Sequence, residues 1–309
     1  MMTASPRSTD ITRHRPLARN QQRRGRRLLR RTAAAAVALA CVATLSPQTS
    51  ASATTTWKTV WADEFNGTAG TGPSSANWFY DLGKNGGWGS NQLESYTSSR
   101  TNSYLDGSGH LALRPVRDSA GNWTSARLES VRSDFRPGSG KKLKISARLQ
   151  LPGGGKGYWP AFWALGSSLR TGAKQWPASG EMDMMENVNN QWQTSGAFHC
   201  GIENGGPCDE PNGRYGWKLT NAAPSTLGWH TYSVVWDTSA SSLSYQVDDV
   251  TYKVIKAADV GTTTWQNTMN QGYFLLLNVA VGGGWPGSPD SSTVSGAPMW
   301  VDYVRVTTT

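Results

Sequence analysis

Short runs with strand-like periodicity recur along this chain, and the glycine and proline clusters between them are the strongest constraint on its fold. The clearest runs are Leu143–Leu151, Trp229–Asp237, Leu243–Val247, Tyr273–Val281 and Met299–Thr307. Asp248-Asp249 predicts a hairpin turn, and segments 137–140, 152–157, 204–212 and 282–289 predict loops. No long helical period accompanies them. Many short strands joined by glycine-rich turns predict an all-β sandwich or barrel.

The first 53 residues differ in composition from the rest. They contain ten arginines and one acid, Asp10, followed by an apolar stretch from Ala33 to Leu45 and the small residues Ala51-Ser52-Ala53. This pattern is typical of a secretory signal peptide cleaved after Ala53, and the 13 apolar residues are too few to span a bilayer. We therefore expect residues 54–309 to be one extracellular domain with no membrane attachment after cleavage.

The formal charge of +9 comes almost entirely from this leader. Of 30 Lys+Arg and 21 Asp+Glu, residues 54–309 keep 20 of each, so the exported part is formally neutral. No basic patch remains to support a nucleic acid partner. About 256 residues are enough for one large core, and nothing in the sequence demands more than a monomer.

Cys41 leaves with the leader, and the exported part keeps Cys200 and Cys208. An even number of cysteines in an oxidising compartment predicts a disulfide. A bridge over so short a loop is worth about 2.5 kcal/mol by the chain-entropy relation. Two cysteines and the neighbouring His199 make a poor zinc site.

Residues 180–186 read Gly-Glu-Met-Asp-Met-Met-Glu and place three carboxylates in an otherwise apolar run. On a strand Glu181 and Asp183 share a face, because side chains alternate with period two. Glu186 joins them only if Met184 or Met185 is absorbed in a β-bulge. The two glutamate backbones would then lie roughly 13 Å apart. Their carboxyls could approach to about 5–5.5 Å, the spacing of a retaining glycosidase.

The alternative is a solvated edge strand that carries three acids on one side. Against it, Met182, Met184 and Met185 would serve the core, so that the acids would line one face of a buried strand. Carboxylates are rarely placed there without a task. The pattern favours catalysis.

All fifteen tryptophans lie in the exported part, and several are candidates for sugar binding. Trp88 and Trp285 sit in loops too rich in glycine to bury a large ring by local packing, and an exposed indole suits the apolar face of a sugar. Trp159 and Trp163 share a strand face, with Phe162 on the opposite, core side. Trp163 could serve either the cleft or packing.

Histidines offer no catalytic triad. His110 and His230 lie in strand-like runs and are expected to be structural. His199 follows Glu186 by thirteen residues, which fits a neighbouring antiparallel strand. It could bond a sugar hydroxyl in the cleft or be a satisfied core histidine.

Taken together, Glu181-x-Asp183-x-x-Glu186 behind Trp176-Pro177 resembles the signature of glycoside hydrolase family 16, in its bulged, laminarinase-like form. Other segments are similar to the same family and follow its order: Trp61–Phe65, Gly87–Asn91, Tyr158–Trp163, Phe198–Gly201 with Gly205–Cys208, Asn278–Gly287 and Val301–Val306. The resemblance spans nearly all of residues 57–307. One segment departs from it, because Lys144 and Ser146 stand where laminarinases often carry arginine and glutamate.

The resemblance implies a β-jelly-roll sandwich of two antiparallel sheets with an open substrate cleft on the concave face. It implies Glu181 as nucleophile, Glu186 as general acid/base and Asp183 between them. Sugar contacts are expected from Trp88, Asn91, Trp159, Trp163, Trp176, His199 and Trp285. No cofactor is implied for catalysis. A structural calcium ion is implied on the convex side, at Glu64, the Gly109 carbonyl and Asp302.

The bulged signature is shared by enzymes that act on 1,3-β-glucans, agars and carrageenans. A sulfated galactan would favour a cleft lined with lysine and arginine, whereas this neutral domain has tryptophan, asparagine and glycine in its predicted cleft loops. The sequence therefore predicts a laminarinase-type endo-1,3-β-glucanase that cleaves β-glucan by double displacement. An agarase-like galactan hydrolase and a non-catalytic β-glucan-binding module remain alternatives.

Overall fold

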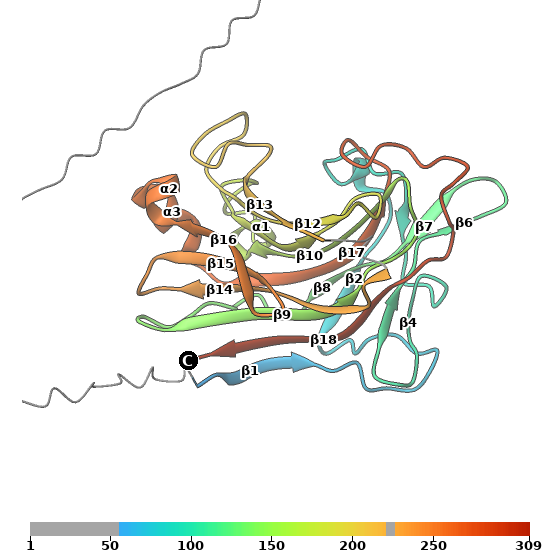
Figure 1. Ribbon diagram of the computed structural model, residues 1–309, viewed down its shortest axis with the longest axis horizontal. Coiled ribbons are helices and arrows are strands. Elements are labelled where there is room, and N and C mark those ends of the chain that lie inside the picture. Colours follow the sequence, from blue (N-terminus) through green and yellow to red (C-terminus); the bar gives the residue numbers. More distant parts are fainter. Residues whose placement is uncertain (1–55, 221–225) are drawn as a thin grey trace, which may run out of the picture. The chain divides into compact units, whose positions relative to one another are not determined.

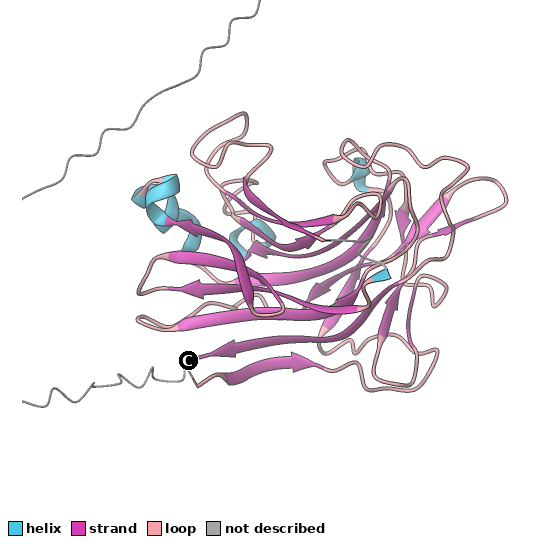
Figure 2. Cartoon of the chain, viewed as in Figure 1, coloured by secondary structure: helices cyan, strands magenta, loops and turns pink. Residues whose placement is uncertain are grey.

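The computed structural model describes residues 56–220 and 226–309, so the predicted signal peptide lies outside the described residues. Strands account for most of the regular structure in this part, and helices are short and lie at its edges (Figure 2). Within it, two antiparallel sheets carry the architecture and a small third sheet flanks them.

The larger antiparallel sheet, as described, has eight strands in the order β16-β15-β14-β9-β18-β5-β4, with β1 paired to β18. Its strands are β1 (Lys58–Asp63), β4 (Ser103–Leu105), β5 (Leu111–Leu113), β9 (Lys142–Gln150), β14 (Trp229–Asp237), β15 (Ser242–Val247), β16 (Val250–Lys256) and β18 (Met299–Thr308).

The second antiparallel sheet, within the same residues, has seven strands in the order β13-β12-β11-β10-β17-β8-β2. We call it the catalytic sheet because β11 carries the three carboxylates. Its strands are β2 (Trp78–Asp81), β8 (Arg127–Ser130), β10 (Tyr158–Gly166), β11 (Glu181–Glu186), β12 (Gln193–His199), β13 (Arg214–Leu219) and β17 (Tyr273–Val281).

The remaining elements are small. The third sheet joins β3 (Ser95–Tyr96), β7 (Trp123–Ser125) and β6 (Val116–Arg117). The helical segments are η1 (Asn85–Gly87), α1 (Ser167–Arg170), α2 (Ala257–Val260) and α3 (Thr262–Met269). Val260 of α2 and Trp265 and Met269 of α3 are buried and join the hydrophobic core, which apolar strand residues mainly fill.

The two large sheets lie one over the other and share one hydrophobic core (Figure 1). The core takes alternate residues from facing strands, such as Ile145 of β9, Val304 of β18, Phe162 of β10 and Leu277 of β17, all with side chains fully buried. Period-two alternation places the intervening residues of β10 and β11 on the opposite face of the catalytic sheet. This face, which points away from the core, is called the catalytic face below. The predicted jelly-roll sandwich is confirmed.

Strand β11 contains the predicted bulge. Asp183 pairs with Ala197 and Glu186 pairs with Ser195, so three steps along β11 match two steps along β12. On the other side Phe162 pairs with Met185 and Trp163 pairs with Asp183, which leaves Met184 as the extra residue. Met182, Met184 and Met185 are all fully buried in the core. The bulge therefore restores Glu186 to the face of Glu181 and Asp183, as expected.

Most boundaries of the predicted strands are within one residue of those observed. Trp229–Asp237 and Tyr273–Val281 match β14 and β17 at both ends. Asp248 and Asp249 form the turn between β15 and β16, both with left-handed backbone (φ 50° and 63°). His199 is the last residue of β12 and lies directly opposite Glu181. The prediction that it belongs to a neighbouring antiparallel strand is therefore confirmed.

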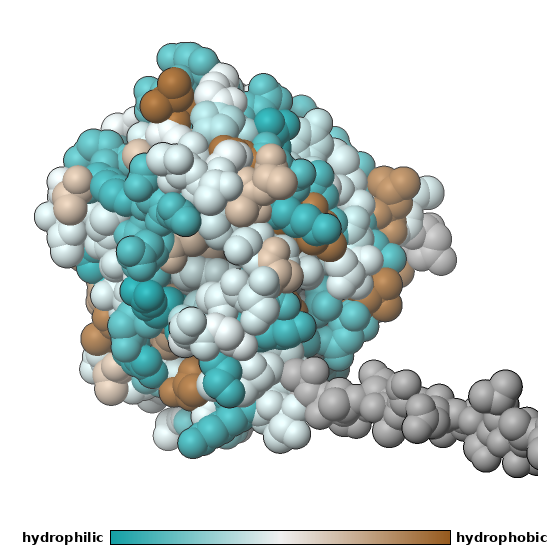
Figure 3. Space-filling model, turned by 90° about the vertical axis from the view of Figure 1, so that its left-hand side faces the viewer, coloured by the Kyte–Doolittle hydropathy of each residue, from teal (hydrophilic) through white to brown (hydrophobic). Residues whose placement is uncertain are grey.

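The surface of the described part gives no sign of a membrane-spanning helix: none of its helices is both long and apolar enough. On the face drawn in Figure 3, apolar side chains form small separate groups among polar ones. Such scattered groups are normal for a protein surface.

The predicted disulfide is present between Cys200 and Cys208, with 5.4 Å between their Cα atoms. We expect replacement of both cysteines by serine to lower the free energy of unfolding by about 2.5 kcal/mol, because the unfolded chain regains the freedom that the cross-link removes. Urea unfolding at neutral pH measures the difference. A reductant should destabilise the wild type and leave the double variant unchanged. Equal stability of the two proteins would contradict the expectation.

Candidate active site

The carboxyls of Glu181, Asp183 and Glu186 lie on the catalytic face, in register with the neighbouring strands. Glu186 pairs with Ala161 of β10 and with Ser195 of β12. Glu181 pairs with Leu165 and His199 in the same way. β11 has a strand on each side, so these acids are half-buried or buried. An edge strand would have left them exposed to solvent. The edge-strand alternative is therefore wrong.

Glu186 is held by two donors. Trp159 Nε1–H donates to its Oε1 (3.0 Å), and Ser195 Oγ–H donates weakly to its Oε2 (3.4 Å). Trp159 comes from β10 and Ser195 from β12, so one carboxyl is fixed from both neighbouring strands. Ser195 was not singled out in the sequence, although its position opposite Glu186 follows once the register of the bulge is known.

Glu181 has a similar partner. Trp176 Nε1–H donates to its Oε2 (3.0 Å), which fixes the carboxyl from the loop before the strand. On the other side the Nε2 atom of His199 lies 3.9 Å from Glu181 Oε1 and 3.3 Å from Asp183 Oδ2. Both tryptophans that the sequence placed next to the catalytic strand therefore bond a catalytic carboxyl directly.

Burial is the main reason why the pKa values of these three carboxyls are raised. It raises the pKa of Glu186 to about 7, with the neighbouring charge of Glu181 adding to it and His199 opposing it. Burial and the adjacent Asp183 likewise raise the pKa of Glu181, and burial raises that of Asp183. Glu181 and Asp183 titrate together, so a proton at this end of the site belongs to the pair. Near neutral pH this group of three carboxyls, taken together, therefore still holds protons that solvated acids would have lost.

His199 does not present a free nitrogen to the catalytic face. Its Nδ1 lies 2.7 Å from Oε2 of Glu210, a residue that the sequence did not single out, and its Nε2 faces Asp183 and Glu181. The His199 side chain is 11% exposed. In this structure the imidazole acts on the carboxylates, and the direct bond to a sugar hydroxyl stays a prediction.

A second group of predicted residues meets on the other side of β10. The Arg127 guanidinium lies over the rings of Trp88 (4.5 Å) and Trp163 (4.7 Å) and donates to Asp81 Oδ2 (2.7 Å). Trp163 Nε1–H donates to Asn278 Oδ1 (2.8 Å). Trp88 is half-buried and not fully exposed as its glycine-rich loop suggested, because Arg127 and Tyr96 cover it.

Trp285 is 42% exposed, and it extends the site toward the edge of the sheet. Its ring contacts Trp159 (5.4 Å between centroids) and Trp217 (6.0 Å), and Trp217 contacts Tyr215 (5.7 Å). Trp217 and Tyr215 belong to edge strand β13 and are 38% and 45% exposed. The sequence analysis missed both, although the alternation Arg-Tyr-Gly-Trp-Lys-Leu indicates a strand with one aromatic face.

The remaining described residues that the sequence analysis discussed for the cleft form no hydrogen bond with these aromatic rings or with the catalytic carboxyls. Asn91 is exposed in the loop after η1, and the structure shows no hydrogen bond from it to the catalytic carboxyls. Its sugar contact stays a prediction. Lys144 and Ser146 lie on β9 of the larger sheet, where Lys144 pairs with Asp249 and Ser146 Oγ donates to the Arg305 carbonyl.

The predicted calcium ligands are engaged otherwise. Arg305 forms a bidentate pair with the Glu64 carboxylate (2.7 Å for both contacts), and Arg148 pairs with Asp302 (2.6 Å). Carboxylates neutralised by guanidinium groups do not fit a divalent cation in this arrangement. The calcium ion stays a prediction.

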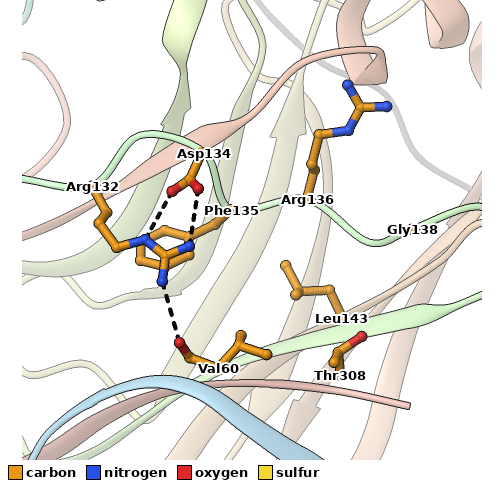
Figure 4. Close-up of a pocket in the computed structure, with 8 residues that line it drawn as sticks. All are labelled: Val60, Arg132, Asp134, Phe135, Arg136, Gly138, Leu143 and Thr308. Carbon is orange, nitrogen blue, oxygen red and sulfur yellow. Dashed lines mark hydrogen bonds and ion pairs between the residues drawn. The ribbon is translucent and has the colours of Figure 1, made fainter.

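A pocket of about 290 Å³ lies away from these residues, lined by Val60, Arg132, Asp134, Phe135, Arg136, Gly138, Leu143 and Thr308 (Figure 4). Arg132 turns to Asp134 and to the Val60 carbonyl, so its hydrogen bonds are used within the pocket wall. None of these residues belongs to the catalytic face, and they form no acid pair.

The raised pKa of Glu186 has a consequence for stability. Since the folded protein holds this proton up to about pH 7 and the unfolded chain only to about 4.5, wild-type stability falls as pH rises between these values. Glu186→Gln removes this loss, and its amide still accepts from Trp159. We expect the variant to be more stable by up to about 3 kcal/mol above pH 7 and equal to wild type below pH 4.5.

Thermal and urea unfolding across this pH range measure the effect. Glu203→Gln, an exposed change of the same kind, serves as control and should show no gain. No stabilisation of Glu186→Gln at pH 8 would contradict the expectation.

Comparison with known proteins agrees with this geometry. The family model for the XgeA-like, catalytic GH16 domain matches residues 103–213. The crystal structure of endo-1,3-beta-glucanase from Streptomyces sioyaensis is 44% identical with a TM-score of 0.79, covering 82% of this chain and 96% of that one. The beta-glucanase of Rhodothermus marinus is 30% identical over 267 residues, 81% of this chain and 85% of that protein.

A further relative is larger. The clotting factor G alpha subunit of Tachypleus tridentatus is 31% identical over 255 residues, which are 81% of this chain and 34% of the subunit, so the chain spans about a third of that relative's length. These three matches cover 81–82% of the chain, and the residues matched by the family model include the carboxylate strand β11. The chain belongs to glycoside hydrolase family 16 and is a glycoside hydrolase.

Proposed function

We propose that this protein is a secreted, retaining endo-1,3-β-glucanase that cleaves internal bonds of laminarin-type glucans. The observation that carries the proposal is the bulged strand β11, which presents Glu181 and Glu186 on one face with an indole N–H bonded to each. The similarity to the endo-1,3-beta-glucanase from Streptomyces sioyaensis supports the substrate.

In the first step Glu181 attacks the anomeric carbon while Glu186 protonates the leaving oxygen. The pKa of Glu186, raised to about 7, suits an acid that must hold its proton near neutral pH. The raised pKa values do not assign the two roles, which come from the family's order along the strand. Glu181 attacks in its ionised form, which the nearby His199 favours by lowering the pKa of this carboxyl. A water deprotonated by Glu186 then releases the glycosyl-enzyme with retained configuration.

The surroundings of the carboxyls favour a neutral polysaccharide. Tryptophan and tyrosine rings flank them, and the nearby cation Arg127 is already paired with Asp81 and covered by two indoles. A sulfated galactan would need unpaired cations for its sulfates. Secretion is supported by the arginine-rich leader with its apolar stretch and by the disulfide, which belongs to an oxidising compartment. A monomer binding β-glucan is sufficient for this activity.

The substrate is tested by comparing products from laminarin, lichenan and agarose. We expect the wild type to release oligosaccharides from laminarin, and Glu181→Gln to lose activity on the order of 10³-fold or more while still binding the glucan. Products from agarose alone would replace the glucan with a galactan. Glucan binding without any products from the wild type would indicate a recognition module.

The two roles are tested with an activated aryl β-glucoside and azide. Glu186→Ala should recover turnover and give the β-glycosyl azide, since azide replaces the water that no longer has a base. Glu181→Ala should give the α-glycosyl azide by direct displacement. The reverse pattern would exchange the two assignments.

The aromatic rings of β13 predict a dependence on chain length. Trp217→Ala should raise KM for long laminarin oligosaccharides about three- to tenfold, because one ring contact is lost, and leave kcat nearly unchanged. The shortest cleavable oligosaccharide should show no change. Trp57→Ala, an exposed indole before β1 of the other sheet, serves as the control. Equal KM values for Trp217→Ala and wild type at every length would contradict the expectation.

A further inference from the structure

A buried row of charged groups connects the disulfide loop with the catalytic strand. Glu210, two residues after Cys208, lies with its Oε2 2.7 Å from His199 Nδ1. The opposite ring nitrogen, Nε2, lies 3.3 Å from Asp183 Oδ2 and 3.9 Å from Glu181 Oε1. One imidazole therefore separates the Glu210 carboxyl from two acids of β11.

The Glu210 carboxyl is fixed in place on both oxygens. Its side chain is fully buried, and Oε1 accepts the backbone N–H of Cys200 (2.9 Å) while Oε2 faces His199. The backbone of Glu210 exchanges hydrogen bonds with Gly205 inside the same loop (2.7 and 2.8 Å). The disulfide joins Cys200, the donor, to Cys208 in the segment that carries the acceptor. This loop is built around the carboxyl.

The histidine ring is held equally closely. Trp176 packs beside it (5.6 Å between centroids), and the backbone of Gly213 passes so near that a Cβ there would come within 2.8 Å of the ring. The charged groups with the largest effect on the imidazole are acids: Glu181, Asp183 and Glu186 on β11, and Glu210 on the loop. Burial lowers its pKa, but the adjacent carboxyls of Asp183 and Glu210 raise it well above 6.5.

Asp183 needs this cation. Its Oδ2 is buried and accepts no hydrogen bond, so the imidazole beside it is its charged partner. An unpaired carboxylate at that depth would be costly. His199 thus lies between the fixed carboxyl of Glu210 and the Asp183 oxygen that accepts no hydrogen bond. These are two separate observations.

We propose that Glu210 is a positioning residue: from the disulfide loop it holds His199 as an imidazolium against Asp183 and Glu181, and so sets the protonation of the catalytic acids without touching substrate. This role rests on the proposed hydrolytic function. It assigns the disulfide loop a part in catalysis besides its part in stability.

The consequence of removing the charge has a definite sign. Glu210→Gln keeps an acceptor for Nδ1–H and removes the anion, so His199 loses its proton at lower pH. The positive charge of His199 lowers the pKa of both Glu181 and Glu186. Without it both acids hold their protons to higher pH, and both limbs of the bell-shaped kcat/KM profile move in the alkaline direction.

The experiment uses the full chain and two independent readouts. Histidine ring signals are titrated by NMR in wild type, Glu210→Gln and the control Glu203→Gln, which makes the same change at an exposed position of the same loop. Each signal is assigned by single histidine substitution. The kcat/KM profile on laminarin oligosaccharides is then measured for the same three proteins.

We expect wild-type His199 to keep its proton well above pH 6.5, and its midpoint to fall by about one unit or more in Glu210→Gln. Both limbs of the profile should move up by about one pH unit, and Glu203→Gln should change neither readout. A loss of activity without a shift would indicate a purely structural residue and overturn the proposal.

Wild-type His199 titrating at or below 6.5 would also overturn it, and this readout needs no variant. An unchanged His199 midpoint in folded Glu210→Gln would do the same. If the wild type releases nothing from laminarin, the glucanase assignment fails, while the NMR titration still decides whether Glu210 holds the charge on His199.

Discussion

The extra residue at Met184 allows one strand to serve two opposite demands. The core needs apolar side chains from β11, and the chemistry needs three carboxyls on the other face. A regular strand would send Glu186 into the core, because side chains alternate with period two. With Met184 absorbed in the bulge, three methionines face inward and three acids face outward over six residues. Every other feature of the site depends on this register, since it decides which residues of β10 and β12 stand beside each acid.

Burial then provides most of the electrostatics. The acids lie in the middle of a sheet with indoles on both sides, so water stabilises their charges poorly and their protons are retained. Indole N–H groups compensate part of this loss for Glu181 and Glu186. The remaining compensation comes from His199, a cation that is itself kept charged by acids. The site is thus a small charged cluster in which the pKa values of Glu181, Asp183, Glu186 and His199 are all raised.

The sequence predicted the features that depend on local pattern. Period-two alternation identified β14 and β17 at both ends, and the spacing of Glu181, Asp183 and Glu186 required the bulge that the structure contains. Two cysteines in the exported part sufficed for the disulfide. The features that it missed depend on pairing between distant segments.

In the sequence Glu210 is one acid in a loop, and no pattern distinguishes it. Its contact with His199 exists only because the loop folds against the end of β12. Tyr215 and Trp217 became part of the site because β13 pairs with β12 in one register. The pairing of Glu64 with Arg305, 241 residues apart, could not be read from either residue.

The position of β13 has an implication for how such an enzyme could diversify. As the terminal strand of its sheet it has a hydrogen-bonded neighbour on one side only, and its outward side chains are exposed, with ring contacts among Tyr215, Trp217 and Trp285. Substitutions at Tyr215, Trp217 or Leu219 can therefore accumulate while the reacting groups two strands away keep their geometry. Selection could change which polymer lengths or branching patterns are accepted through substitutions in β13 alone, without altering the catalytic residues.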